Sequence, residues 1–243
     1  MHIPSLDDIW QTTLGLNDFD AWRLEAAINR NQWPAYGLTL VVHPLPGPGL
    51  GPPRVLEAIA ELRFACEQAL SCSFFPEDSL HFTVYSLQRS RPEPFSPLEL
   101  EELWNRLVSE LRPILEAIPP FTLSLRGLAV TADGAILIGV DDSPVLRGLR
   151  QVMEAIPGVS SPRSYPPHVT IGQVLAPCGS AESFRQTMGY LRAWQDVLVG
   201  ELSVPALKLI YYSSRLLAAV EHRTEFTLGK ASISEERTGQ KSY

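Results

Sequence analysis

Cysteine is scarce in this sequence, and its few occurrences form no recognisable pattern. The three cysteines are Cys66, Cys72 and Cys178, and no two of them make a Cys-x-x-Cys pair. An odd number without paired spacing argues against a disulfide framework and against a zinc site. We therefore expect neither a bound metal nor another cofactor, and a reducing cytoplasm as the location of the protein.

A long apolar run is also missing. No stretch approaches the roughly 20 residues that a membrane-spanning helix requires. The first residues, Met-His-Ile-Pro-Ser-Leu-Asp-Asp, have neither the basic region nor the apolar core of a secretory signal. We expect a soluble protein without a membrane partner.

Positive charge is not in excess either. Lysine and arginine number 20 against 27 aspartates and glutamates, so the formal net charge is −7. Proteins that bind long nucleic-acid duplexes need a broad basic field, and this chain does not supply one. A local site for a small phosphate is still compatible with this composition, which is otherwise that of a globular protein.

The chain divides into three parts. Residues 1–35 have the apolar spacing of one or two amphipathic helices and form an N-terminal extension. Residues 36–229 hold the main α+β region, and the polar tail 230–243 is predicted to be disordered. The Pro/Gly stretch 44–53 fits no nucleotide-binding fingerprint and is interpreted as a surface turn.

Alternation and helical spacing predict the elements of the main region. Helices are expected at about 53–70, 97–117, 143–156 and 180–196. Strands are expected at about 36–43, 80–85, 121–131, 135–140, 167–172, 199–213 and 216–228. The order strand, helix, strand, helix occurs once in 36–117 and again in 121–196, which indicates a loose topological repeat.

One short motif appears at the equivalent place in each repeat. Leu80-His81-Phe82-Thr83-Val84 and Pro167-His168-Val169-Thr170-Ile171 each interrupt an apolar run with His-x-Thr. Side chains alternate faces along a strand, so the histidine and threonine of each motif share one face. The apolar residues between and around them point to the opposite face and anchor the strand on a core.

Two histidines and two threonines suit displacement at phosphorus. One group must take a proton from the attacking oxygen and another must give one to the leaving oxygen. Histidine serves both needs because its ordinary pKa lies near neutrality. A neighbouring hydroxyl can donate a hydrogen bond to a phosphate oxygen.

Each of these residues also has a plainer structural interpretation. A lone histidine in an apolar strand is more often structural than catalytic, but two in matching settings reverse that expectation. Tyr85 shares the face of His81 and Thr83 if the strand stays regular, and could then stack on a base; tyrosine is also a common strand residue. His43 precedes a proline, has no threonine partner, and is interpreted as the end of a strand.

The paired motifs resemble the signature of the two-histidine (2H) phosphoesterases, which include RNA 2′,3′-cyclic phosphodiesterases and 2′–5′ RNA ligase-like proteins. The resemblance covers about residues 36–229 and implies a bilobal α+β fold, with lobes at about 36–118 and 119–229. Two antiparallel sheets would be related by a pseudo-twofold around a central groove, with helices outside. It also implies His81 and His168 as the acid and base, and Thr83 and Thr170 as phosphate ligands.

The sequence therefore predicts a metal-independent phosphodiesterase that hydrolyses 2′,3′-cyclic or 2′–5′-linked phosphodiesters of nucleotides or RNA ends. The alternative is a module that binds a nucleotide or RNA end in the same groove without turnover. A third possibility is a structural protein in which the two motifs occur together by chance.

Overall fold

The computed structural model describes residues 5–15, 35–43, 53–67, 70–131, 134–159, 167–177, 180–213 and 220–229. Within these residues the chain forms five α-helices, one short 3-10 helix and nine strands. In the described part of the chain, no helix is both long enough and apolar enough to span a membrane. The second helix expected in the N-terminal extension and the tail 230–243 lie outside the described residues.

Local sequence explains where the helices begin. Ser96 caps α4 by accepting from the Glu99 backbone N–H, and the Glu99 side chain accepts in return from the Ser96 backbone. Ser143 and Ser180 cap α5 and α6 in the same position. The helices are α1 (Leu6–Gly15), α3 (Pro53–Glu67), α4 (Pro97–Ala117), α5 (Pro144–Glu154) and α6 (Ala181–Arg192).

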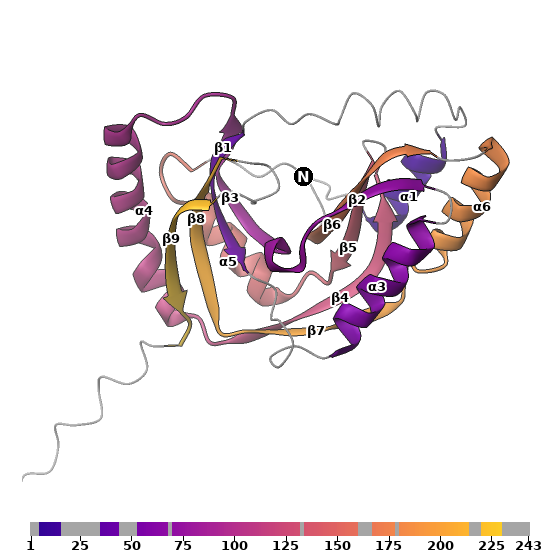
Figure 1. The fold of residues 1–243 in the computed structure, drawn as a ribbon. Helices are drawn as coiled ribbons and strands as arrows, with labels where there is room; N and C mark the ends of the chain where they lie inside the picture. The colour runs from indigo at the N-terminus through magenta and orange to yellow at the C-terminus, as the bar shows by residue number, and fades with distance from the viewer. Residues whose placement is uncertain are drawn as a thin grey trace, which may run out of the picture.

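The strands form one antiparallel sheet in the order β7-β4-β5-β6-β3-β1-β8-β9, with β2 paired to β6. Figure 1 shows two groups of strands, β1, β3, β8 and β9 beside α4, and the remaining strands beside α3 and α6. The strands are β1 (Tyr36–Val42), β2 (Leu70–Phe74), β3 (Phe82–Arg91), β4 (Phe121–Val130), β5 (Ala135–Val140), β6 (His168–Pro177), β7 (Leu198–Val204), β8 (Ala206–Tyr212) and β9 (Val220–Thr227).

The two groups of strands meet at the motifs. The register of β3 and β6 contains one paired position, Phe82 opposite Val169. This pair makes the strands a single continuous sheet, whereas two separate sheets were expected. The mixed helix and antiparallel-strand architecture is as predicted.

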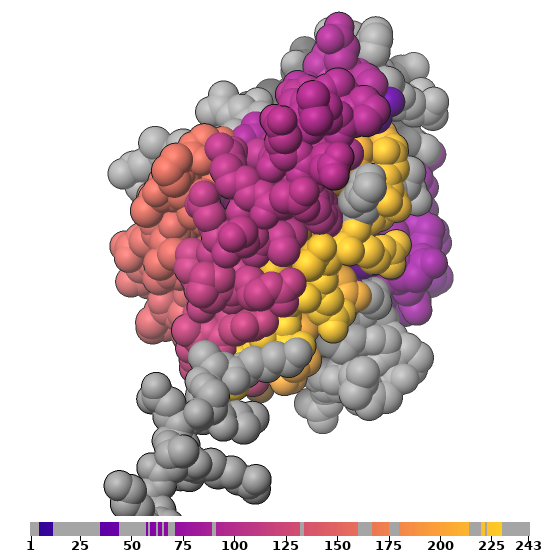
Figure 2. Space-filling model, turned by 90° about the vertical axis from the view of Figure 1, so that its left-hand side faces the viewer, coloured from indigo at the N-terminus to yellow at the C-terminus, as the bar shows by residue number. Residues whose placement is uncertain are grey.

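Helices cover the sheet from outside. Figure 2 shows α4 lying beside β9, with α5 on its other side. On the opposite side of the molecule, α3 contacts β2 and β7, and α6 contacts β4. Apolar side chains from these helices and from both groups of strands form one core cluster, which includes Phe82 and Val169.

Two sequence-based expectations about strands were wrong. The segment 199–213 is not one strand, because Pro205 divides it into β7 and β8. Proline lacks the N–H that a sheet interior needs, and the two pieces pair with different partners, β7 with β4 and β8 with β1. The short strand β2 was not predicted at all.

Strands from the C-terminal part of the chain pair with strands from its N-terminal part. β8 and β9 join β1 and β3, while β2 pairs with β6. The division into lobes at about 36–118 and 119–229 stays a prediction. α1 packs against β4, where the fully buried Trp10 donates from Nε1 to the Leu128 carbonyl at 2.8 Å.

Candidate active site

The two His-x-Thr motifs lie side by side in the sheet. Phe82 and Val169 are fully buried in the core, whereas all four motif side chains, His81, Thr83, His168 and Thr170, are partly exposed. Because neighbouring strand residues point to opposite faces, the four share the face that is turned away from this core. We call this the polar face.

The register brings the two motifs together. Phe82 pairs with Val169 in an antiparallel register. The residues next to this pair are therefore also opposite one another, His81 beside Thr170 and Thr83 beside His168. Directly opposite residues have Cβ atoms about 5 Å apart. Each histidine therefore has the threonine of the other motif beside it as well as its own, and the two imidazoles interact electrostatically across the site.

The chain follows the same path after each motif. Burial alternates identically through 80–87 and 167–174. The pairing of β1 with β3 slips by one residue at Val84, and the pairing of β5 with β6 slips by one residue at Ile171. Each slip is a β-bulge, which reverses the side-chain alternation beyond it. Both bulges come three residues after the histidine.

The first bulge changes the position of Tyr85. Its side chain is 2% exposed and belongs to the core cluster. The expectation that Tyr85 shares the face of His81 was wrong, because the bulge at Val84 turns it to the other side of the sheet. At the equivalent place after the second motif stands Gly172, where a Cβ would come within 2.8 Å of Phe74 on β2.

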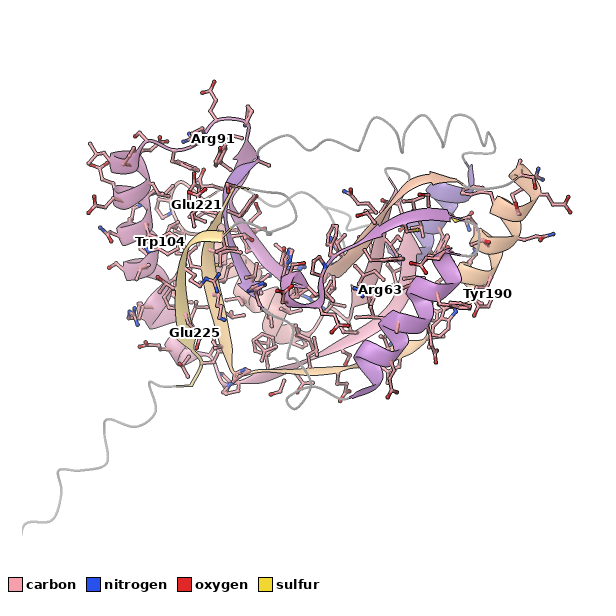
Figure 3. The ribbon with its side chains drawn as sticks, in the orientation of Figure 1. Arg63, Arg91, Trp104, Tyr190, Glu221 and Glu225 are labelled. Atoms are coloured by element: carbon pink, nitrogen blue, oxygen red, sulfur yellow. The ribbon has the colours of Figure 1, made fainter. Side chains whose placement is uncertain are left out.

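Each bulge is held through its carbonyl oxygen. The Arg150 Nε on α5 donates to the Val84 carbonyl at 3.4 Å. The Phe75 backbone N–H donates to the Ile171 carbonyl at 3.0 Å, and Arg63 on α3 donates to the Phe75 carbonyl at 2.8 Å. Figure 3 shows Arg63 projecting from α3 toward the middle of the molecule. Two arginines from two different helices thus support the two motif strands.

His81 has a defined tautomer. Its Nδ1 lies 2.9 Å from the Ser79 carbonyl oxygen, in the 3-10 turn Glu77–Ser79 that leads into β3. A carbonyl can only accept, so Nδ1 carries the hydrogen, and in the neutral ring Nε2 is left with its lone pair. Burial, with a smaller contribution from the charges of His43 and His168, lowers the pKa of His81 to about 4, although the hydrogen bond to the Ser79 carbonyl acts in the opposite direction.

A third histidine stands beside His81. The ring centroids of His43 and His81 are 6.4 Å apart. Burial lowers the pKa of His43, and the positive charges of Lys208 and Arg223 lower it further, against a hydrogen bond to the backbone of Asp78 and the charge of that residue. Sequence reasoning missed this neighbour because it judged His43 by its lack of a threonine partner.

Described residues outside the four motif side chains line at least two hollows. The larger, about 460 Å³, is between the far end of β3 and α4 and includes Gln88, Arg91 and Arg106. The smaller, about 310 Å³, lies beside the second motif and is bounded by Leu6, Gly139 and Pro167. Among the described residues, no group of three or more His, Cys, Asp or Glu side chains is placed to hold a metal ion.

Comparison with known proteins identifies the class. The family model of the 2′-5′ RNA ligase superfamily matches residues 51–214, a segment that contains both motifs. The chain belongs to this superfamily, that of the 2H phosphoesterases, as the motifs predicted. Membership is consistent with a phosphodiesterase activity. No curated protein matches the sequence.

Solved structures resemble this chain at low sequence identity. TT0787 of Thermus thermophilus is 21% identical, with a TM-score of 0.47, over 78% of this chain and 97% of that one. Escherichia coli LigT complexed with ATP is 17% identical, with a TM-score of 0.45, over 80% and 99%. ATU0111 of Agrobacterium tumefaciens, a conserved protein of unknown function, is 18% identical, with a TM-score of 0.50, over 80% and 85%.

Proposed function

We propose that this protein is a metal-independent phosphodiesterase that hydrolyses 2′,3′-cyclic or 2′–5′-linked phosphodiesters of nucleotides or RNA ends. The observation that carries the proposal is the pairing of Phe82 with Val169, which gathers two histidines and two threonines on one face of the sheet. Membership in the 2′-5′ RNA ligase superfamily supports the same reaction class.

The chemistry divides between the two motifs. A water oxygen attacks the phosphorus, and the bond from phosphorus to one ribose oxygen breaks. One imidazole takes the proton that the water loses, and the other gives a proton to the leaving ribose oxygen. Thr83 and Thr170 donate hydrogen bonds to the non-bridging oxygens, where negative charge develops. One water molecule is consumed, and solvent exchange restores the two imidazoles.

Substrate sets the protonation states. In the free protein His81 is neutral at pH 7, because its pKa lies near 4. A phosphate anion within hydrogen-bond distance favours the protonated form of an imidazole. The pair can then hold one neutral and one protonated ring, which is the combination that the reaction needs.

Turnover of a substrate panel tests the proposal. The purified protein is incubated with 2′,3′-cyclic mononucleotides and 2′–5′ oligonucleotides, with and without a chelator, and the products are resolved chromatographically. We expect hydrolysis that the chelator does not slow, and a bell-shaped dependence of rate on pH. Binding of these compounds without any product would instead support the binding-module alternative.

Variants assign the reaction to the motifs. His81→Ala or His168→Ala should lower kcat by roughly 100-fold to 10,000-fold, the usual contribution of general acid–base catalysis. Thr83→Val and Thr170→Val should cost about tenfold each, the value of one hydrogen bond to a charged group. Thr122→Val, at an exposed position on β4, is the matched control and should leave kcat unchanged. Full activity in a His81→Ala/His168→Ala protein would refute the proposal.

A further inference from the structure

Charge is distributed unevenly along the polar face. On the side of the first motif, strand register continues from β3 across β1, β8 and β9. Thr83 lies opposite Val41, and Val41 lies opposite Lys208. One row away, Thr39 lies opposite Ile210, and Ile210 lies opposite Arg223. Directly opposite residues of an antiparallel pair share a face, so Lys208 and Arg223 stand on the same face as Thr83.

His43 completes this group. It follows β1 on the alternation that already places Thr39 and Val41 on the polar face. Its ring lies 6.4 Å from the ring of His81, and it is close enough to Lys208 and Arg223 to be affected by both charges. β8 is two strand spacings, about 10 Å, from β3. The length of the Lys208 side chain allows its ammonium group to lie closer to the motif than this distance.

Of the two cations in this group, Lys208 is paired with an acidic side chain, whereas Arg223 has no such partner among the described residues. Lys208 Nζ lies 3.4 Å from the Glu225 carboxylate, which belongs to the edge strand β9 (Figure 3). Arg223 is exposed and makes no ion pair with any residue that the structure describes. Asp78 is the other acid near His43. Val41 and Ile210 form a small apolar cluster on this side of the sheet, and both are fully buried, so the polar side chains and not this cluster are available to a ligand.

The side of the second motif differs. Gly139 lies opposite His168 in the register, and a Cβ at position 139 would come within 2.8 Å of the Leu6 Cδ1 atom. The N-terminal helix α1 therefore packs on β5 at the position opposite His168. The adjoining hollow is lined by four aspartates, Asp7, Asp141, Asp142 and Asp196. The arginines around it are already paired, Arg126 with Asp141, Arg147 with Asp142 and Arg192 with Asp7.

We propose that His43, Lys208 and Arg223 form a second phosphate subsite beside the motif site. The substrates that fit carry a further phosphate one nucleotide position away from the scissile one, as in a nucleotide with a 5′-phosphate or the end of an RNA strand. A bound RNA strand would run from the motif site toward β8 and β9, and not toward α1. This inference rests on the proposed function for the identity of the scissile group.

A binding experiment tests the subsite independently of turnover. Adenosine 3′-monophosphate and adenosine 3′,5′-bisphosphate are titrated calorimetrically into the protein at low salt. The second phosphate should tighten binding about tenfold, the effect of charge-assisted hydrogen bonds from these side chains. Lys208→Gln/Arg223→Gln should bring the two affinities together, because it weakens binding of the bisphosphate much more than binding of the monophosphate. Glu225→Gln, which releases Lys208, should widen the difference.

Control variants make the outcome decisive. Arg185→Gln, at an exposed position on α6, removes the same charge elsewhere and should keep the tenfold preference. If the double variant does not fold, the exposed Arg223→Gln alone should still reduce the preference. Equal affinities in the unmodified protein, or a preference that the double variant retains, would overturn the subsite.

Turnover separates the two proposals. Hydrolysis of 2′,3′-cyclic nucleotides without any preference for a 5′-phosphate would overturn the subsite and leave the phosphodiesterase activity standing. A preference in binding without hydrolysis of any compound would do the reverse.

Discussion

The depressed pKa of His81 makes the stability of this protein depend on acid in a way that one substitution should remove. Between its ordinary pKa of 6.5 and its folded pKa of about 4, the unfolded chain binds a proton at His81 that the folded chain does not. Acidification therefore favours unfolding. The contribution of neutral His81 to the free energy of unfolding is fully present above pH 6.5. It decreases as the pH falls from 6.5 and is lost at about pH 4.

The magnitude follows from the width of the window. The gap between 6.5 and about 4 corresponds to about 3 kcal/mol of unfolding free energy, since each pH unit is worth roughly 1.4 kcal/mol. His81→Gln keeps a polar side chain that does not titrate. Between about pH 7.5 and pH 4, it should lose about 3 kcal/mol less stability than the unmodified protein.

Urea unfolding at several pH values measures this difference. Thr83→Val is the matched control, since it alters the same strand but keeps His81, and its stability should fall with acid as steeply as that of the unmodified protein. If the free energies of unfolding of His81→Gln and the unmodified protein fell in parallel with pH, the fold would not lower the pKa of His81. The electrostatic account of the site would then be wrong.

Three further predictions concern the support of the site. Gly172→Ala should destabilise the fold by about 1–3 kcal/mol in urea unfolding, because the added Cβ would lie 2.8 Å from the Ser73 carbonyl oxygen. Gly189→Ala on α6 is the control: its added Cβ would meet no neighbouring atom within 4 Å, and the change should be neutral or stabilising by about 0.5–1 kcal/mol. Arg150→Met should cost about 1–3 kcal/mol, because the partly buried Val84 carbonyl bond is lost, and should lower kcat; unchanged turnover would remove Arg150 from the support of the motif. Cys72 should alkylate slowly with iodoacetamide at about pH 8 when followed by peptide mass spectrometry, because a hydrogen bond with Cys66 and burial raise the pKa of its thiol.

Local sequence was enough to locate the motifs and the main elements. Ser96, Pro97 and Glu99 mark the start of α4 by capping chemistry that acts within one turn. The alternation around His81 and His168 predicted which side chains would face away from the core, and the burial of Phe82 and Val169 agrees. These features depend only on neighbours within a few residues.

The bulges could not be predicted in the same way. Val84 is an ordinary strand former between Thr83 and Tyr85, and Ile171 is followed by Gly172, which can accompany a bulge but does not require one. Each bulge exists only against a partner strand, β1 in one case and β5 in the other. The condition that would have kept Tyr85 on the face of His81, a regular strand up to residue 85, fails for this reason.

Long-range contacts also hid the supporting residues. Arg63 and Arg150 read in sequence as charges on the outer faces of helices. Their acceptors, the carbonyls of Phe75 and Val84, come within reach only when each helix packs on its strands. The place of His43 depends in turn on the pairing of β1 with β3.

The single pair formed by Phe82 and Val169 also bears on which insertions and deletions this chain can tolerate. Adding or removing one residue in β3 just after Thr83, or in β6 just after Thr170, would put the motif out of register with the rest of its strand and turn one of the two to the opposite face. A conservative substitution at Phe82 or Val169 changes only packing. At this joint the protein is therefore expected to tolerate changes in side-chain identity better than changes in chain length.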